Sequence, residues 1–379
     1  MADYFKQRER QVVKHTELIK EDLPYFCEEF FIGVESTTSP LTRQGYSYDL
    51  RIFFDFLTKK VAHFRNKNIK DITLEDMEYV TSHDIELYIS YLSYYSINGK
   101  EYSNGERGKA RKVSTIRAFF KYFYNNNELT QDVASKVAVP KQHQKDIIRL
   151  EGQESNDMLQ AADTGQNMSK HQHQVQRNTK YRDVAIITLL LGTGIRVSEL
   201  VGLNVNDIDF NNRAITVTRK GGNVAILYFG DEVADAVATY MDTERTSLLN
   251  RCEKLNKDED ALFLSLQVRR ITVRSVELLV KKYAQNSVPL KKITPHKLRS
   301  TFGTNLYRAT GDIYLVADVL GHSDINTTTK HYAALKENSR KIAAEVTQVY
   351  QDKIAPLKQE MKKIAAEVTT VHKDTDNPE

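Results

Sequence analysis

The chain has 379 residues, of which 40% are hydrophobic and 27% charged, and its formal net charge is +4. This balance is typical of a globular protein large enough for two domains, and it excludes a disordered chain. Its longest apolar run is too short to cross a membrane, and its two cysteines, Cys27 and Cys252, lack metal-ligand spacing. The charged N-terminus has no apolar segment behind it, so we expect a reduced cytoplasmic protein with no membrane or metal partner.

Three stretches near the N-terminus repeat apolar residues at helical spacing. They are residues 47–60, 84–95 and 113–124. No alternating strand pattern competes with them, so residues 1–139 are predicted to form an all-helical domain.

The stretch that leads into the third of these helices, and most of that helix, carries a basic excess. Residues 100–121 contain seven Lys or Arg and two Glu, an excess that suits a polyanion. The aromatic residues of the third helix recur at helical spacing, so they are predicted to lie in the core and not against the polyanion. The basic side chains predicted to face the polyanion are Lys109, Arg111, Lys112, Arg117 and Lys121.

A polar stretch, residues 140–149, is predicted to link this domain to a second one over residues 150–345. In the second domain, the polar insertion 164–180 should be an exposed loop or an exposed helix. An apolar helix follows at 182–191 and ends at the Gly192-Thr193-Gly194 break.

Two β-rich runs, 214–218 and 224–229, flank a glycine-containing turn that is typical of a hairpin. Helical patterns follow, and Thr294 with Pro295 is predicted to begin one of them. The second domain should therefore be α+β with a small antiparallel sheet, and the whole chain mainly α.

The tail, residues 346–379, includes part of an internal repeat. The heptapeptide at 341–347 recurs at 363–369, which would place the same stripe on one helical face, although Pro356 lies between them. A solvated tail and one that docks on another subunit both fit this pattern.

Charged residues in the second domain form several candidate site segments. Arg196 and Glu199 are three apart, so on a helix they would share a face and Glu199 could hold the guanidinium; a surface ion pair is the alternative. Lys220 lies at the hairpin tip, where it could reach a ligand or simply be solvated. His296 and Arg299 also share a helical face near a helix N-terminus, and no carboxylate or thiolate at ligand spacing favours a metal there.

Two further candidates lie near the end of this domain. Gly321 is predicted to end a helix, which puts His322 in a bend. Tyr332 follows on the next helix. Taken alone, His322 would be structural and Tyr332 is one of twenty tyrosines.

Taken together, these segments have the order Arg196, Lys220, His296, Arg299, His322 and Tyr332. This order and the motifs GTGIRVSEL, TPHKLRSTFGTNLY and LGHSDINTTTKHY resemble the tyrosine recombinase (phage integrase) family over about residues 150–347. The basic helix, ARKVSTIRAFFKYFY, is similar to a helix of the family's core-binding domain. Within the family the likeness is greatest to Xer-type recombinases, and it leans toward the single-protein streptococcal kind.

The resemblance implies a site-specific recombinase that cleaves and rejoins duplex DNA through a 3′-phosphotyrosyl link, without cofactors. Arg196 and Arg299 would clamp the scissile phosphate. Tyr332 would be the nucleophile, His296 its base, and Lys220 the acid for the 5′ oxygen. His322 would bind the phosphate or steady Tyr332. The implied partners are DNA with inverted-repeat sites and three further copies of the chain, with any accessory protein unidentified.

The sequence departs from the Xer pattern at two points. His322 and Tyr332 are ten residues apart, one more than expected, and Ser300 replaces a histidine. Three alternatives stay open: a mobile-element integrase, a type IB topoisomerase, and a DNA-binding regulator without activity.

Overall fold

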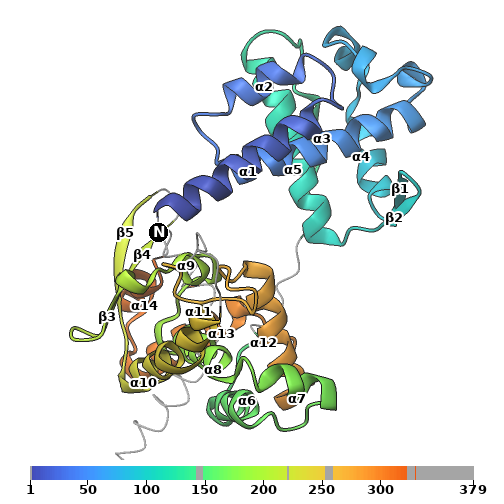
Figure 1. Cartoon of the computed structure of the whole chain (residues 1–379). Helices are drawn as coiled ribbons and strands as arrows, with labels where there is room; N and C mark the ends of the chain where they lie inside the picture. The colour runs from blue at the N-terminus through green and yellow to red at the C-terminus, as the bar shows by residue number, and fades with distance from the viewer. Residues whose placement is uncertain (1, 142–147, 220–221, 252–258, 322–328, 330–379) are drawn as a thin grey trace, which may run out of the picture. The chain divides into compact units, whose positions relative to one another are not determined.

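The computed structural model describes residues 2–141, 148–219, 222–251, 259–321 and 329. It divides into two compact units, residues 1–146 and 147–379. Most elements are helices and the sheets are small, so the predicted fold class is confirmed (Figure 1). No helix in the described ranges has the length and apolar character needed to span a bilayer.

The first unit is built around two aromatic helices, α3 and α5. Phe53 of α3 and Phe119 and Phe120 of α5 are fully buried, which confirms that these rings are core. Each buried ring contributes about 1.5–3 kcal/mol relative to an exposed one. The helices are α1 (Ala2–Lys20), α2 (Cys27–Gly33), α3 (Pro40–Lys60), α4 (Ser82–Tyr91) and α5 (Glu106–Asn125). Short 3-10 turns lie at Ala62–Phe64, Ile69–Asp71, Glu75–Tyr79 and Val133–Lys136.

A buried carboxylate joins α3 to α5. Asp49 is 0% exposed and accepts two hydrogen bonds from Arg111, at 2.5 and 2.6 Å, and one from Thr115 at 2.8 Å. Lys112 adds an ion pair at 3.3 Å. Because a buried carboxylate is stable only when it is paired and hydrogen-bonded, these contacts fix the register of the two helices.

A short hairpin interrupts the helices of the first unit, and the all-helical prediction missed it. Strands β1 (Tyr95–Ile97) and β2 (Lys100–Tyr102) are antiparallel, with Ile97 opposite Lys100. Asn98 and Gly99 form the two-residue turn, and both have positive φ angles, 51° and 72°. Asn-Gly is the preferred sequence for such a turn, so the signal was present but its strands are only three residues long.

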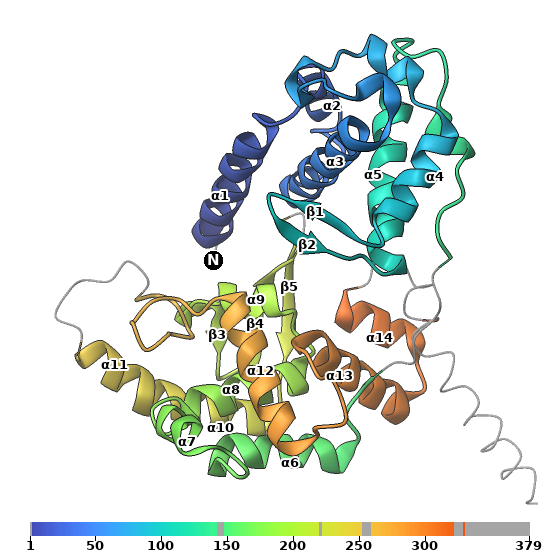
Figure 2. The same cartoon turned by 90° about the vertical axis from the view of Figure 1, so that its right-hand side faces the viewer.

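The second unit packs helices around α8, with a three-stranded antiparallel sheet, β3–β4–β5, to one side (Figure 1; Figure 2). Its helices are α6 (Gly152–Thr164), α7 (Lys170–Gln176), α8 (Lys180–Thr193), α9 (Val197–Gly202), α10 (Asp231–Tyr240), α11 (Thr246–Asn250), α12 (Val273–Ser287), α13 (Pro295–Thr310) and α14 (Ile313–Leu320). A 3-10 turn lies at Val205–Asp207 and the π-helical η6 at Met241–Arg245. The strands are β3 (Ile208–Asp209), β4 (Ala214–Thr218) and β5 (Val224–Tyr228).

The predicted hairpin and the predicted insertion are both described. Strands β4 and β5 pair from Ala214 opposite Tyr228 to Thr218 opposite Val224, which confirms the hairpin. Residues 170–176 of the insertion form α7, and short non-helical segments lie on both sides of it, so the insertion is part helix and part loop. Gln176 at its end is 4% exposed and donates to the carbonyls of Ala162 and Asp163, so this end is anchored on α6.

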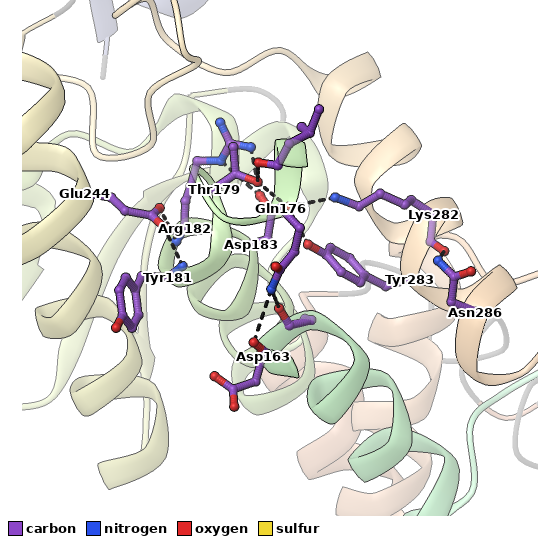
Figure 3. A network of polar contacts seen from close by, with 12 residues as sticks. Asp163, Gln176, Thr179, Tyr181, Arg182, Asp183, Glu244, Lys282, Tyr283 and Asn286 are labelled. Carbon is purple, nitrogen blue, oxygen red and sulfur yellow. Dashed lines mark hydrogen bonds and ion pairs between the residues drawn. The ribbon is translucent and has the colours of Figure 1, made fainter. Parts of the chain in front are cut away.

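A buried polar network ties α8 to α12 (Figure 3). Asp183 in the first turn of α8 is 1% exposed and accepts hydrogen bonds from Tyr283 at 2.8 Å and Lys282 at 3.1 Å. Arg182 donates to the same carboxylate at 2.8 Å. Burial, together with the Asp183 carboxylate, raises the pKa of Tyr283 above its usual range, so its hydroxyl stays a donor. The network thereby fixes the start of the helix that leads to Arg196.

Candidate active site

Arg196 is positioned by a glycine turn and by Glu199. Helix α8 ends at Gly194 in the left-handed conformation, φ +62°, where a β-carbon would overlap the ring of Phe302. Arg196 is the residue before α9 and not within a helix, which corrects the predicted shared helical face. Glu199 still holds it, because its carboxylate accepts from the Arg196 backbone N–H at 3.0 Å and from Nη1 at 2.7 Å.

Arg299 is placed by α13, which begins at the predicted Thr294-Pro295 pair. The side chain of Arg299 is buried, and Nη1 donates to the Gly194 carbonyl at 2.5 Å. Nη2 donates to the carbonyl of Leu320, the last residue of α14. A guanidinium, which stays charged even when buried, is suited to such a position.

Both arginines meet at the C-terminal end of α14. Nη2 of Arg196 also donates to the Leu320 carbonyl, at 3.2 Å, and to the Gly321 carbonyl at 2.8 Å. Two guanidinium groups therefore share one acceptor, even though residues 196 and 299 lie far apart in the sequence. The carbonyls at this helix end, which carry the negative end of the helix dipole, and the Glu199 carboxylate offset their repulsion. Two adjacent permanent cations can bind an anion such as a phosphate.

His296 lies one turn before Arg299 on α13 and is exposed, whereas Arg299 is buried. Its backbone carbonyl accepts from the hydroxyl of Ser300 at 3.0 Å. Ser300 is 8% exposed, so the residue that departs from the Xer pattern is packed inside the unit.

The remaining three predicted catalytic residues, Lys220, His322 and Tyr332, lie outside the residues that the structure describes. Gly321, which directly precedes His322, ends α14 in the left-handed conformation, as predicted. Arg219 directly precedes Lys220, and no sequence motif singles it out. Its Nη2 donates to the Val319 carbonyl at 3.0 Å.

Comparison with known proteins identifies the family. Residues 149–339 match the Phage integrase family. The chain belongs to this family. It is a tyrosine recombinase, an enzyme that breaks and rejoins DNA strands.

Its relatives include Xer recombinases. Tyrosine recombinase XerC of Caldanaerobacter subterraneus subsp. tengcongensis is 32% identical over 327 residues, which cover 84% of this chain and 83% of the relative. Tyrosine recombinase XerS of Streptococcus mutans is 30% identical over 345 residues, 85% of this chain and 95% of the relative. The resemblance to Xer-type recombinases, including the streptococcal kind, is therefore confirmed.

Solved structures share the fold. The XerH site-specific recombinase bound to palindromic difH substrate superposes with a TM-score of 0.59 at 19% identity, over 81% of this chain and 80% of that one. The Tn1549 transposon integrase in complex with circular intermediate DNA gives a TM-score of 0.57 at 20% identity, over 82% and 95%.

The basic residues predicted to face a polyanion lie in the recombinase's first unit, and their surroundings differ. Lys112 is 6% exposed beside Asp49, so the structure gives it a partner inside the unit. Arg111 shares that carboxylate, but half of its side chain is exposed. Arg117 donates to the carbonyls of Ala134 and Val137. Lys109 donates to Ser93 at 2.6 Å, and Lys121 is exposed.

Proposed function

We propose that this Xer-type recombinase cleaves each DNA strand by attack of Tyr332 on a phosphate held between Arg196 and Arg299. The convergence of the two guanidinium groups on the Leu320 carbonyl supports this proposal most strongly. Attack on phosphorus increases the negative charge on the non-bridging oxygens. Two fixed guanidinium groups stabilise that charge more in the transition state than in the ground state, and so they accelerate cleavage.

The proton transfers follow from the groups involved. The Tyr332 hydroxyl loses its proton to His296 as its oxygen bonds to phosphorus, because an unperturbed phenol has a pKa near 10. The bond from phosphorus to the 5′ oxygen breaks, and that oxygen keeps the electron pair and takes a proton from Lys220. His322 hydrogen-bonds the phosphate. The product is a 3′-phosphotyrosyl link with a free 5′ hydroxyl, and reversal of the same steps rejoins DNA.

The phosphoester bond is exchanged and not hydrolysed, so rejoining needs no nucleotide energy source. The two arginines supply the positive charge that a metal ion would supply elsewhere. We therefore assign no cofactor to the reaction.

We further propose that four copies act on paired inverted-repeat sites in the cytoplasm. In the basic helix α5, Lys109, Arg111 and Lys121 reach the surface and are the residues we assign to DNA phosphates. The tail, residues 346–379, lies outside the described residues. Its docking on a neighbouring copy stays a prediction, which a truncation after Ala344 tests: recombination should be lost while cleavage of a single site persists.

A suicide substrate tests the nucleophile. Such a duplex has a nick beside the cleavage site, so the released fragment diffuses away and the covalent complex accumulates. The wild type should form that complex, whereas Tyr332→Phe should bind the same DNA with similar affinity and form none. Covalent trapping by Tyr332→Phe would contradict the assignment.

The alternatives give different results. A type IB topoisomerase would relax supercoiled plasmids that lack any specific site, and a regulator without activity would bind DNA and never form the complex. Strand exchange between two copies of one inverted repeat is the result expected here.

A further inference from the structure

Arg219 connects the β4–β5 hairpin to the end of α14. It directly follows β4, and its backbone closes the hairpin loop: its N–H donates to the Asn223 carbonyl at 2.7 Å and its carbonyl accepts from Gly222 at 3.1 Å. Its side chain leaves the sheet and donates from Nη2 to Val319 at 3.0 Å. One residue thus fixes the hairpin through its backbone and the helix end through its guanidinium.

The guanidinium of Arg219 also lies against Gly321. This glycine has φ +59°, and a β-carbon built on it would overlap the Nη1 and Cζ atoms of Arg219. The contact therefore requires a glycine both for its backbone conformation and for space. Within the described residues, the Arg219 Nε atom is buried and has no hydrogen-bond partner. A buried N–H without a partner is unfavourable, and a surface arginine would avoid it by turning toward solvent, so packing holds this guanidinium in place.

The helix end that Arg219 contacts is the one where the two phosphate-clamping arginines meet. Arg219 donates to Val319, while Arg196 and Arg299 donate to Leu320. The end of β4, the residue before α9 and the first half of α13 are thereby held on the last carbonyls of α14. The carbonyl groups in the last turn of a helix stabilise nearby cations. Guanidinium groups are therefore electrostatically favourable at the end of α14.

Both residues of this contact directly precede a predicted catalytic residue. Arg219 is followed at once by Lys220, and Gly321 is followed at once by His322. The contact between Arg219 and Gly321 therefore holds these two residues beside the arginine pair. Each of them is the residue directly before a catalytic candidate.

We propose that Arg219 is a positioning residue for strand cleavage, which holds the start of the Lys220 loop at the end of α14 so that a proton reaches the 5′ leaving oxygen. This inference rests on the proposed function, in which Lys220 is the general acid. Arg219 itself touches no reacting atom.

A substrate with sulfur in place of the bridging 5′ oxygen distinguishes a role in proton delivery from a general structural role. A thiol has a pKa near 8.5, whereas the pKa of an alcohol is far higher, close to that of water. A leaving thiolate needs no proton, so cleavage of the sulfur substrate does not depend on a general acid. A defect confined to proton delivery disappears with sulfur, and a defect in folding or phosphate binding does not.

The experiment measures single-turnover formation of the covalent complex with oxygen and sulfur suicide substrates, together with DNA affinity and melting temperature. Arg219→Ala should slow the oxygen substrate by up to about 100-fold, the loss expected from misplacement of a catalytic group by about 1 Å. The sulfur substrate should be slowed by less than about threefold. Lys220→Ala should give the same pattern. The control is Arg213→Ala at the other end of β4, where the arginine pairs with Asp231; it should match the wild type on both substrates.

Equal slowing of both substrates by Arg219→Ala, or no slowing of the oxygen substrate, would overturn the inference. Arg219→Lys keeps the charge and the apolar stem, so it supplies a second variant in case the alanine form does not fold; it should show a smaller loss that sulfur also restores. If sulfur rescues Lys220→Ala and neither Arg219 variant, only this inference fails. If the wild type forms no covalent complex with either substrate, the proposed function itself fails.

Discussion

At the scale of single residues, Glu199 is the group that orients Arg196. Its side chain is 4% exposed, and its two oxygens bind the backbone and the guanidinium of Arg196. Glu199→Gln keeps the size and one acceptor but removes the charge. We expect single-turnover cleavage to fall by about tenfold, within the range for loss of an orienting partner, with little change in DNA affinity.

Glu277→Gln provides the matched control, because Glu277 forms an exposed ion pair with Arg274 at the same sequence spacing. It should cleave at the wild-type rate. If Glu199→Gln cleaved as fast as this control, Glu199 would have no orienting role.

Spacing predicted the pairing of Arg196 with Glu199, but for a reason that the structure corrects, since Arg196 lies outside the helix. The contact of Arg219 with the end of α14 could not be predicted. Its partner, Val319, is one hundred residues away, and nothing local distinguishes Arg219 from any other turn arginine.

At the scale of elements, the start of α8 depends on the charge of Asp183. Asp183→Asn would leave Lys282 and Arg182 beside a neutral side chain in a buried site. We expect the free energy of unfolding of the second unit to fall by about 3 kcal/mol, because an uncompensated buried charge is costly. Urea unfolding followed by far-UV circular dichroism measures this.

The control for this change is Asp163→Asn, which removes a more exposed ion pair with Lys180, again at the start of α8. Its effect should be below about 1 kcal/mol. Equal losses in the two variants would mean that the Asp183 network adds no more than a surface pair.

Elements with strong local signals could be predicted from the sequence. The β4–β5 hairpin and the end of α14 at Gly321 depend on turn and capping residues, and both are confirmed. The β1–β2 hairpin was missed although Asn98-Gly99 marks its turn, because three-residue strands show no clear alternation.

At the scale of the whole molecule, DNA affinity should depend on those α5 cations that reach the surface. Lys121→Gln should reduce the slope of log affinity against log salt concentration by about one, because one phosphate contact is lost. Lys112→Gln, on the same helix, should leave the slope unchanged, because Lys112 is buried beside Asp49.

Fluorescence anisotropy with labelled duplex DNA at several salt concentrations measures both slopes. Equal slopes for wild type and Lys121→Gln would remove Lys121 from the interface. A reduced slope for Lys112→Gln would place that lysine on DNA after all.

The family and the mainly helical fold could be predicted for the whole chain, because the motifs and helical patterns are local. The buried networks could not. Arg111 and Asp49 are 62 residues apart, and Lys282 and Asp183 are 99 apart. Such pairs become visible only when packing brings their helices together.

If Tyr332 is the nucleophile, it becomes covalently linked to DNA during cleavage. The most direct measurement is mass spectrometry of the trapped suicide complex after digestion with trypsin and nuclease. We expect a nucleotide adduct on the phenolic oxygen of Tyr332 and a free 5′ hydroxyl on the released strand. An adduct on another residue, or a 5′-linked phosphate, would contradict it.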